Sequence, residues 1–256
     1  MFNESKLKQV IALTQECNKC AMLHFKTFNK NSVNFKTDNS PVTQADLEVS
    51  KMAVNGLQKI FPDIKIISEE SNKSQKFFKN NKVFWLIDPI DGTKEYINSS
   101  PNFTVNFALI ENRLPVFGLI SQPHSGIIWY SFKGQAWKIE PKQAISNAKH
   151  IQCSSINYDK LRILSSFNHR STELDNWISI AKPISDSHIG SSIKFCYMAE
   201  GKVDFYPRTS PTMEWDIAAG HSILKAAGGN IVSEFGLEIQ YGKVNFKNKK
   251  FLAFGK

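Results

Sequence analysis

Four short β-rich segments follow one another in the middle of the chain, and they restrict the fold more than any other feature. They are Phe103–Ile110, Pro115–Ser121, Gly126–Tyr130 and Gln135–Ile139, interrupted by Glu-Asn-Arg, Gln-Pro-His-Ser-Gly and Lys-Gly. β-rich runs separated by short breaks that contain turn-forming residues are typical of consecutive hairpins. The pattern therefore predicts an antiparallel meander.

Two helical patterns precede the meander. The first has apolar residues at helical spacing along one stripe, at Leu7, Val10, Ile11, Cys17, Cys20 and Ala21. A second helix is expected from near Thr43 to the proline at position 62. A Cys-x-x-Cys pair can also be half of a redox or zinc motif, but no second pair of ligands is visible. We therefore expect both cysteines to pack inside a helix face.

The second half of the chain alternates between strands and helices. We expect strands at 161–165 and 203–206, and helices at 173–180, 192–200 and 217–227, the last closed by Gly228-Gly229. The polar segment 140–148 is the best boundary, so we predict an N-terminal α+β domain, 1–145, and a C-terminal α/β domain, 146–256. The predicted fold class is α+β, with an antiparallel sheet first and a smaller mixed sheet second.

Composition excludes a transmembrane protein. Hydrophobic residues make up 41% of the 256 residues, but no apolar stretch approaches the ~20 residues that span a bilayer. The first residues show no apolar core followed by a small-residue cleavage site, and the four cysteines are too few for a disulfide framework. We therefore expect a cytoplasmic protein.

The charge of the chain points to an anionic partner. A net charge of +9 and a pI near 9.3 suit nucleic acid, anionic lipid or a small polyphosphate. However, the lysines are spread along the chain, and no run interleaves arginine with aromatic residues. A polymeric nucleic acid is therefore the less favoured partner.

The segment Asp88-Pro-Ile-Asp-Gly-Thr93 is the strongest candidate for chemistry. It follows the apolar run 83–87, so two carboxylates, a backbone carbonyl and a hydroxyl emerge together at the end of an expected strand. Magnesium prefers such oxygen ligands and typically uses one or two carboxylates. Gly92 allows a phosphate to approach the backbone closely, although a simple turn would also use Asp, Pro and Gly here.

Other carboxylates recur at the ends of expected elements. Glu69 and Glu70 follow the apolar run 65–67, and Asp216 begins an expected helix after Trp215. Two acidic residues have a structural alternative. Asp216 could be a helix N-cap, and Asp46, which lies near the start of the second expected helix, could be the acidic end of a capping box that begins at Thr43. The conjunction of these carboxylates favours a metal site over the separate alternatives.

The spacing of the two aspartates argues against a covalent intermediate. Phosphatases that form an aspartyl-phosphate have two aspartates at positions i and i+2 after their first strand. Here Asp88 and Asp91 are at positions i and i+3, with a proline between them.

Taken together, these motifs resemble those of the inositol monophosphatase superfamily. Its members share a Glu-Glu element, an Asp-Pro-Ile/Leu-Asp-Gly-Thr element and a later Trp-Asp, in the order and approximate spacing seen here. The resemblance covers nearly the whole chain from Asp38 onward. Three segments look most like those of the CysQ-type 3'(2'),5'-bisphosphate nucleotidases, namely Asp38–Asp46, Ser191–Gly201 and Tyr206–Arg208.

The resemblance implies a layered α-β-α-β-α sandwich of the inositol monophosphatase and fructose-1,6-bisphosphatase type. It also implies that two or three Mg²⁺ ions are held by Glu69, Asp88, the carbonyl of Ile90, Asp91 and Asp216. Thr93 paired with Asp46 would help to activate the attacking water, and Glu69 would also take part in catalysis. Such a metal centre lowers the pKa of water and offsets phosphate charge.

The implied reaction is hydrolysis of adenosine 3',5'-bisphosphate to AMP and phosphate by metal-activated water, in sulfate assimilation and nucleotide recycling. The implied substrate contacts are Glu69, Ile90, Asp91, Gly92, Thr93, Ser191, Lys194, Arg208 and Asp216. A bisphosphate needs charge-assisted donors beyond the metals, which is a role for Lys194 and Arg208. The alternatives are a solvated helix face for Lys194 and a surface ion pair for Arg208.

Other functions stay open at this point. Inositol monophosphatase or fructose-1,6-bisphosphatase activity is the alternative within the same class of enzyme. A protein that has kept the fold but binds nucleic acid is disfavoured by the intact carboxylates. The sequence leaves open the oligomeric state and peripheral association with the cytoplasmic face of the inner membrane.

Overall fold

The computed structural model describes residues 2–28, 33–35, 41–71, 82–165 and 171–256. The first residues of the 38–46 motif lie outside this part of the chain. Within the described residues, no helix combines the length and apolar character needed to cross a bilayer.

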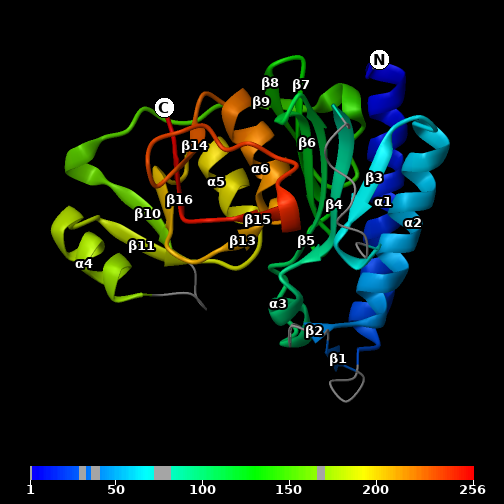
Figure 1. The fold of residues 1–256 in the computed structure, drawn as a ribbon, viewed down its shortest axis with the longest axis horizontal. Helices are drawn as coiled ribbons and strands as arrows, with labels where there is room; N and C mark the ends of the chain where they lie inside the picture. Colours follow the sequence, from blue (N-terminus) through cyan, green and yellow to red (C-terminus); the bar gives the residue numbers. More distant parts are fainter. Residues whose placement is uncertain (1, 29–32, 36–40, 72–81, 166–170) are drawn as a thin grey trace.

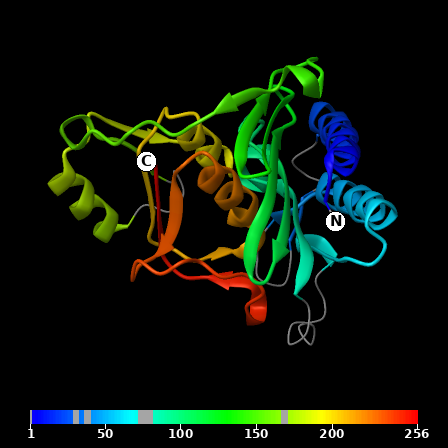
Figure 2. The same ribbon diagram turned by 90° about the horizontal axis from the view of Figure 1, so that it is seen from above.

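Two long helices form the first layer and cover one face of a large sheet (Figures 1 and 2). They are α1 (Glu4–Lys26) and α2 (Gln44–Ile60), as the apolar patterns predict. The side chain of Asn3 begins α1 by accepting a hydrogen bond from the Lys6 N–H at 3.0 Å. Cys17 is fully buried, as expected, whereas Cys20 packs against the same core but is partly exposed.

The large sheet has seven strands in the order β3-β4-β5-β6-β7-β8-β9. Their bounds are β3 Lys65–Ser68, β4 Val83–Asp91, β5 Thr104–Glu111, β6 Leu114–Gln122, β7 Ile127–Phe132, β8 Gln135–Ile139 and β9 Lys149–Ile151. The predicted meander is confirmed, since the strands from β4 to β9 pair antiparallel with their neighbours. The sheet departs from the expected antiparallel arrangement at one strand, because β3 pairs parallel to β4.

Two helices cover the opposite face of this sheet, α5 (Ile193–Ala199) and α6 (Glu214–Ala226). The packing of α6 on β6 is close: a Cβ added at Gly118 would lie 2.2 Å from the carbonyl oxygen of Ala219. The core on this face draws on residues from both predicted domains, and β9 extends the first sheet beyond position 145. The division at 145/146 stays a prediction.

A second sheet packs on the far side of α5 and α6. Its order is β11-β10-β12-β16-β14, with bounds β10 Arg162–Ser165, β11 Ser185–His188, β12 Phe205–Arg208, β14 Asn230–Ser233 and β16 Phe251–Phe254. It contains parallel and antiparallel pairs, so the prediction of a smaller mixed sheet is confirmed. With α4 (Thr172–Ala181) outside it, the layers run α-β-α-β-α, as expected (Figure 1).

The remaining elements of the described residues are short. They are β1 Asn34–Phe35, β2 Pro41–Val42, the 3₁₀ turn η2 Glu69–Ser71, α3 Thr93–Ile97, η4 Ile145–Asn147, η5 Tyr158–Lys160, β13 Thr212–Met213, η6 Val244–Phe246 and β15 Lys247–Asn248.

Candidate metal and phosphate site

Parallel pairing of β3 and β4 brings the first two carboxylates to one edge of the large sheet. Ser68 is the register partner of Ile87, so Glu69 and Asp88 follow at the same level on neighbouring strands. In an antiparallel pair the two ends would lie at opposite edges. The unexpected parallel strand is therefore what places Glu69 beside the Asp88 segment.

A β-bulge brings Asp91 to the same face as Asp88. Asp88 pairs with Asn106 and Asp91 with Thr104, so three steps along β4 match two steps along β5. Side chains three residues apart in a regular strand point to opposite faces, and one extra residue restores the same face. Pro89, which has no N–H to donate, lies within this irregular stretch.

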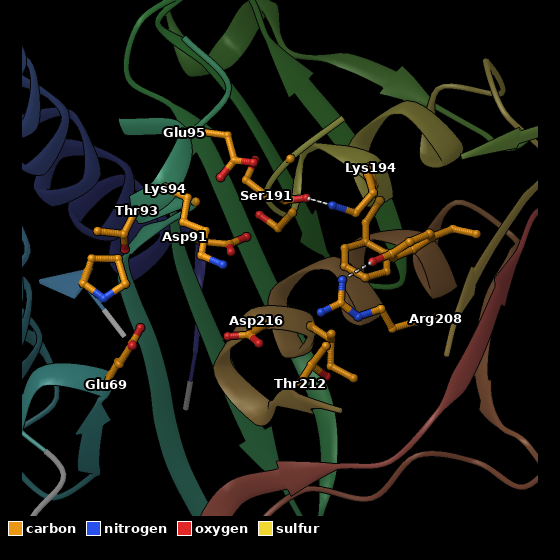
Figure 3. Close-up of a pocket in the computed structure, with 17 residues that line it drawn as sticks. Glu69, Asp91, Thr93, Lys94, Glu95, Ser191, Lys194, Arg208, Thr212 and Asp216 are labelled. Carbon is orange, nitrogen blue, oxygen red and sulfur yellow. Dashed lines mark hydrogen bonds between the residues drawn. The ribbon is translucent and has the colours of Figure 1, made fainter. Parts of the chain in front are cut away.

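Asp216 reaches the cleft from the start of α6. The helix begins at Glu214, earlier than predicted, with Met213 as the N-cap, so the interpretation of Asp216 as an N-cap is wrong. Asp216 is the third residue of the helix, and one of its carboxylate oxygens accepts a hydrogen bond from the Met213 N–H at 2.7 Å. The same side chain lines the cleft, where it lies between Asp91 and Thr212 (Figure 3).

The carboxylates are electrostatically costly without a cation. Burial, followed by the charges of Glu69, Asp91 and Asp216, raises the pKa of Asp88 well above its ordinary value. Burial is also the main cause that raises the pKa of Asp91 to about 6, and burial with the charge of Asp91 raises the pKa of Asp216. Buried charges of one sign need compensation, and an all-oxygen donor set suits a hard divalent cation. The residues therefore fit a metal site.

The carboxylates surround the cleft rather than one point. Among the described residues they do not form a group of three whose oxygens all lie within 4.8 Å of one another. Carboxylates spread in this way are compatible with magnesium, which typically uses only one or two of them per ion.

Gly92 and Thr93 follow the two aspartates of β4, and Thr93 contacts Asp46 of α2. Gly92 has φ +94°, and a Cβ there would lie 3.2 Å from both the Asn102 carbonyl oxygen and the Ser191 Cβ, so this turn favours glycine. The Thr93 hydroxyl lies 3.2 Å from the Ile90 carbonyl oxygen and 3.3 Å from Asp46 Oδ1, and it can donate to either. Thr93 lines the cleft, whereas Ile90 is buried behind it.

Asp46 makes the contacts expected from both interpretations of the sequence. Its Oδ2 accepts hydrogen bonds from the Thr43 N–H at 2.8 Å and the Thr43 hydroxyl at 2.6 Å, which is the capping role. Its Oδ1 is the atom that faces Thr93. One buried carboxylate therefore starts α2 with one oxygen and reaches the catalytic candidate with the other.

Lys194 is buried rather than solvated. Only 5% of the residue is exposed, so the alternative of a solvated helix face is wrong. Its ammonium donates to the carbonyls of Ile189 at 3.1 Å and Ser191 at 2.5 Å, and lies 5.1 Å from the centre of the Tyr206 ring. Ser191 has φ +54°, an uncommon conformation for a residue with a side chain. Lys194 thus holds this turn of the cleft wall.

Arg208 forms part of the opposite wall (Figure 3). Its Nε donates to the Ser210 carbonyl at 3.3 Å and its guanidinium donates to the Tyr206 hydroxyl at 3.5 Å. Its positive charge lowers the pKa of Asp216, against the larger effect of burial. The cleft has a volume of about 230 Å³, with carboxylates on one side and this cation on the other.

Three polar residues that the sequence did not single out support Asp91. The Asn106 amide donates to Asp91 Oδ2 at 3.5 Å, the Ser192 hydroxyl donates to Asn106 Oδ1 at 2.8 Å, and Ser192 and Thr104 share a hydrogen bond of 2.8 Å. Asn106 and Thr104 alternate on the inner face of β5, and their polarity within an apolar strand is the signal that could have revealed them.

Comparison with known proteins agrees with this geometry. The sequence model of the inositol monophosphatase family matches residues 3–249. The chain is 36% identical to the 3'(2'),5'-bisphosphate nucleotidase CysQ of Salmonella typhimurium, over 92% of this chain and 93% of that protein. It is 34% identical to the protein of the same name from Buchnera aphidicola, over 96% and 92%.

A solved structure has the same fold. It is that of CysQ from Bacteroides thetaiotaomicron, described as a bacterial member of the inositol monophosphatase family. Its TM-score is 0.82 at 29% identity, covering 100% of this chain and 98% of that one.

Proposed function

The chain belongs to the inositol monophosphatase family, and from this premise we propose that it is a magnesium-dependent 3'(2'),5'-bisphosphate nucleotidase. Its substrate would be adenosine 3',5'-bisphosphate, converted to AMP and phosphate in sulfate assimilation and nucleotide recycling. The observation that carries the proposal is a cleft lined by the partly exposed carboxylates of Glu69, Asp91 and Asp216, with the guanidinium of Arg208 on the opposite wall. The name shared by the similar proteins supports the choice of substrate.

Members of this family are metal-dependent phosphatases. We propose that two or three Mg²⁺ ions bind to Glu69, Asp88, Asp91, Asp216 and the Ile90 carbonyl. When bound, the ions would supply Lewis-acid chemistry, which lowers the pKa of water and neutralises phosphate charge. Asn106 would orient Asp91 for this role through its amide.

Thr93 and Asp46 would handle the proton of the attacking water. When the Thr93 hydroxyl donates to Asp46 Oδ1, its oxygen lone pairs are left to accept a hydrogen bond from a water in the cleft. The two hydrogen bonds from Thr43 hold the carboxylate in this orientation. As the water oxygen attacks phosphorus, the water proton would pass to Thr93 while the hydroxyl proton of Thr93 moves to Asp46. The ester oxygen would leave with the electron pair of the broken P–O bond and take a proton from solvent.

The opposite wall would bind the phosphate that is not cleaved. A guanidinium can donate to phosphate through two parallel N–H groups, so Arg208 is the best-suited group. Lys194 contributes a second positive charge, but its ammonium is already bound to backbone carbonyls. We therefore propose that Lys194 acts largely by holding Ser191, together with Gly92, at the edge of the cleft.

The proposal places the enzyme in the cytoplasm, and a reducing compartment suits its four free cysteines. Its partner would be a small nucleotide rather than a polymer.

One comparative assay tests the proposed function. Phosphate release is measured with Mg²⁺ from adenosine 3',5'-bisphosphate, inositol 1-phosphate and fructose 1,6-bisphosphate, for the wild type and Asp91→Asn. We expect the highest kcat/KM on the nucleotide and no turnover by the variant. A higher kcat/KM on either sugar phosphate would replace the proposal with the alternative activity. Phosphate release that survives in Asp91→Asn would show that it does not come from this cleft.

A further inference from the structure

Three potential metal ligands meet between α1 and α2, on the outer layer of the molecule. Cys20 and His24 are four residues apart on α1, so their side chains lie on the same helix face, one turn apart. Glu48 comes from the second turn of α2. One ligand atom from each residue lies within 4.8 Å of the other two, and His24 Nε2 is 2.9 Å from Glu48 Oε2.

This cluster is accessible and partly oriented. The side chains of His24 and Glu48 are 26% and 47% exposed, and Cys20 is partly exposed, so an ion could enter from solvent. Gln44 Nε2 donates to Glu48 Oε1 at 2.9 Å, which leaves Oε2 directed at His24. In metal sites, a hydrogen bond to the ligand atom that does not face the metal typically orients the ligating side chain.

We propose that Cys20, His24 and Glu48 bind one Zn²⁺ ion, with water in the fourth position. Zinc accepts sulfur, nitrogen and oxygen ligands in tetrahedral geometry, with bonds that separate a nitrogen from an oxygen ligand by about 3.3 Å. The His24–Glu48 contact would thus open by only a few tenths of an ångström. A thiolate and a carboxylate together balance the charge of the ion.

The chemistry of this site differs from that of the carboxylate cleft. Magnesium prefers oxygen ligands, whereas a thiolate and an imidazole select a softer ion such as zinc. In the metal-free protein, burial and then the charge of Glu48 raise the pKa of the Cys20 thiol. Zinc binding therefore releases the thiol proton to solvent as the sulfur–metal bond forms. The bound ion would link α1 to the helix that carries Asp46.

Cobalt(II) provides the test, because a cobalt–thiolate bond gives a charge-transfer absorption that an oxygen-only site lacks. The full-length reduced protein is titrated with Co²⁺ in saturating Mg²⁺, so that the carboxylate cleft is occupied. We expect a thiolate band that saturates at one Co²⁺ per chain, disappears in Cys20→Ser and is removed by added Zn²⁺. His24→Gln and Glu48→Gln should each weaken binding by at least about tenfold.

Cys17→Ala is the matched control, since Cys17 lies one turn earlier on the same helix but is fully buried. It should keep the thiolate band at wild-type affinity. The proposal is overturned if the wild type shows no thiolate band, if the band persists in Cys20→Ser, or if His24→Gln binds Co²⁺ as tightly as the wild type. His24→Gln changes a partly exposed side chain, so it tests the proposal even if a cysteine variant folds poorly.

Discussion

The replacement Thr93→Val separates the catalytic interpretation of Asp46 from its capping role. Valine keeps the branched shape of threonine but removes the hydroxyl that lies 3.3 Å from Asp46 Oδ1 and 3.2 Å from the Ile90 carbonyl oxygen. A hydroxyl has one proton, so at most one of these hydrogen bonds is donated at a time. The lost bond should therefore cost stability of only about 1 kcal/mol.

The expected effect on catalysis is larger. Removal of a group that takes a proton in the transition state typically lowers the rate by ~10²-fold or more. At 1.36 kcal/mol per decade, a hundredfold loss is about 2.7 kcal/mol of transition-state stabilisation. KM should hardly change, because the group acts on the attacking water and contributes little to holding the substrate. The assay is steady-state phosphate release from adenosine 3',5'-bisphosphate at saturating Mg²⁺.

Thr43→Val is the matched control, because Thr43 donates to the other oxygen of the same carboxylate at 2.6 Å. The Thr43 N–H still donates to that oxygen at 2.8 Å in the variant, so Asp46 keeps one anchor. We expect a stability loss of about 1 kcal/mol with kcat close to that of the wild type. The reasoning is refuted if Thr93→Val keeps normal kcat, or if both variants lose kcat to the same extent.

Three further predictions concern charge. Asp91→Asn should abolish turnover. At pH values above 6 it should also raise the thermal unfolding midpoint of the metal-free protein, because burial raises the pKa of Asp91 to about 6 and the ionised carboxylate then destabilises the fold. A lower midpoint for the variant in the presence of a chelator would contradict this. Arg208→Ala should lower kcat/KM for the bisphosphate nucleotide by roughly ten- to a hundredfold and change activity on a monophosphate far less, because a charge-assisted contact is worth ~1.5 to 3 kcal/mol; equal losses on both substrates would assign Arg208 to the fold or the metal site. Burial lowers the pKa of His221 to about 4, so the unfolded chain binds a proton more readily than the folded chain, and the free energy of unfolding should fall by about 2 kcal/mol from pH 7 to pH 5. His221→Gln should lack this loss when its unfolding by urea is measured at both pH values. If the variant shows the same pH dependence as the wild type, His221 is not its source.

Much of the architecture is determined locally by the sequence. Helical and β-rich segments were predicted correctly where periodicity and turn residues agree, as in the meander and in α1 and α2. The predicted carboxylates also lie at the ends of strands or in the first turn of a helix. These features depend on neighbours within a few residues, so the sequence is sufficient to predict them.

Long-range pairings are decided only by the tertiary structure. No local pattern announces that β3 runs parallel to β4, yet this pairing brings Glu69 to the edge where Asp88 lies. Lysine is usually a surface residue, but the ammonium of Lys194 is buried and donates hydrogen bonds to two backbone carbonyls. The sequence pairs Cys20 with Cys17 as a Cys-x-x-Cys motif, whereas in the folded chain Cys20 lies beside His24 on the same helix and Glu48 on α2.

The β-bulge at Asp88 and Asp91 shows the limit most clearly. The sequence determined that two aspartates follow an apolar strand with a proline and an isoleucine between them. In a regular strand this spacing would direct the two carboxylates to opposite faces of the sheet. Only the pairing with β5, which inserts one extra residue into β4, brings both to the face that packs against α6. A site made of carboxylates that repel one another therefore depends on a register that only the folded sheet defines.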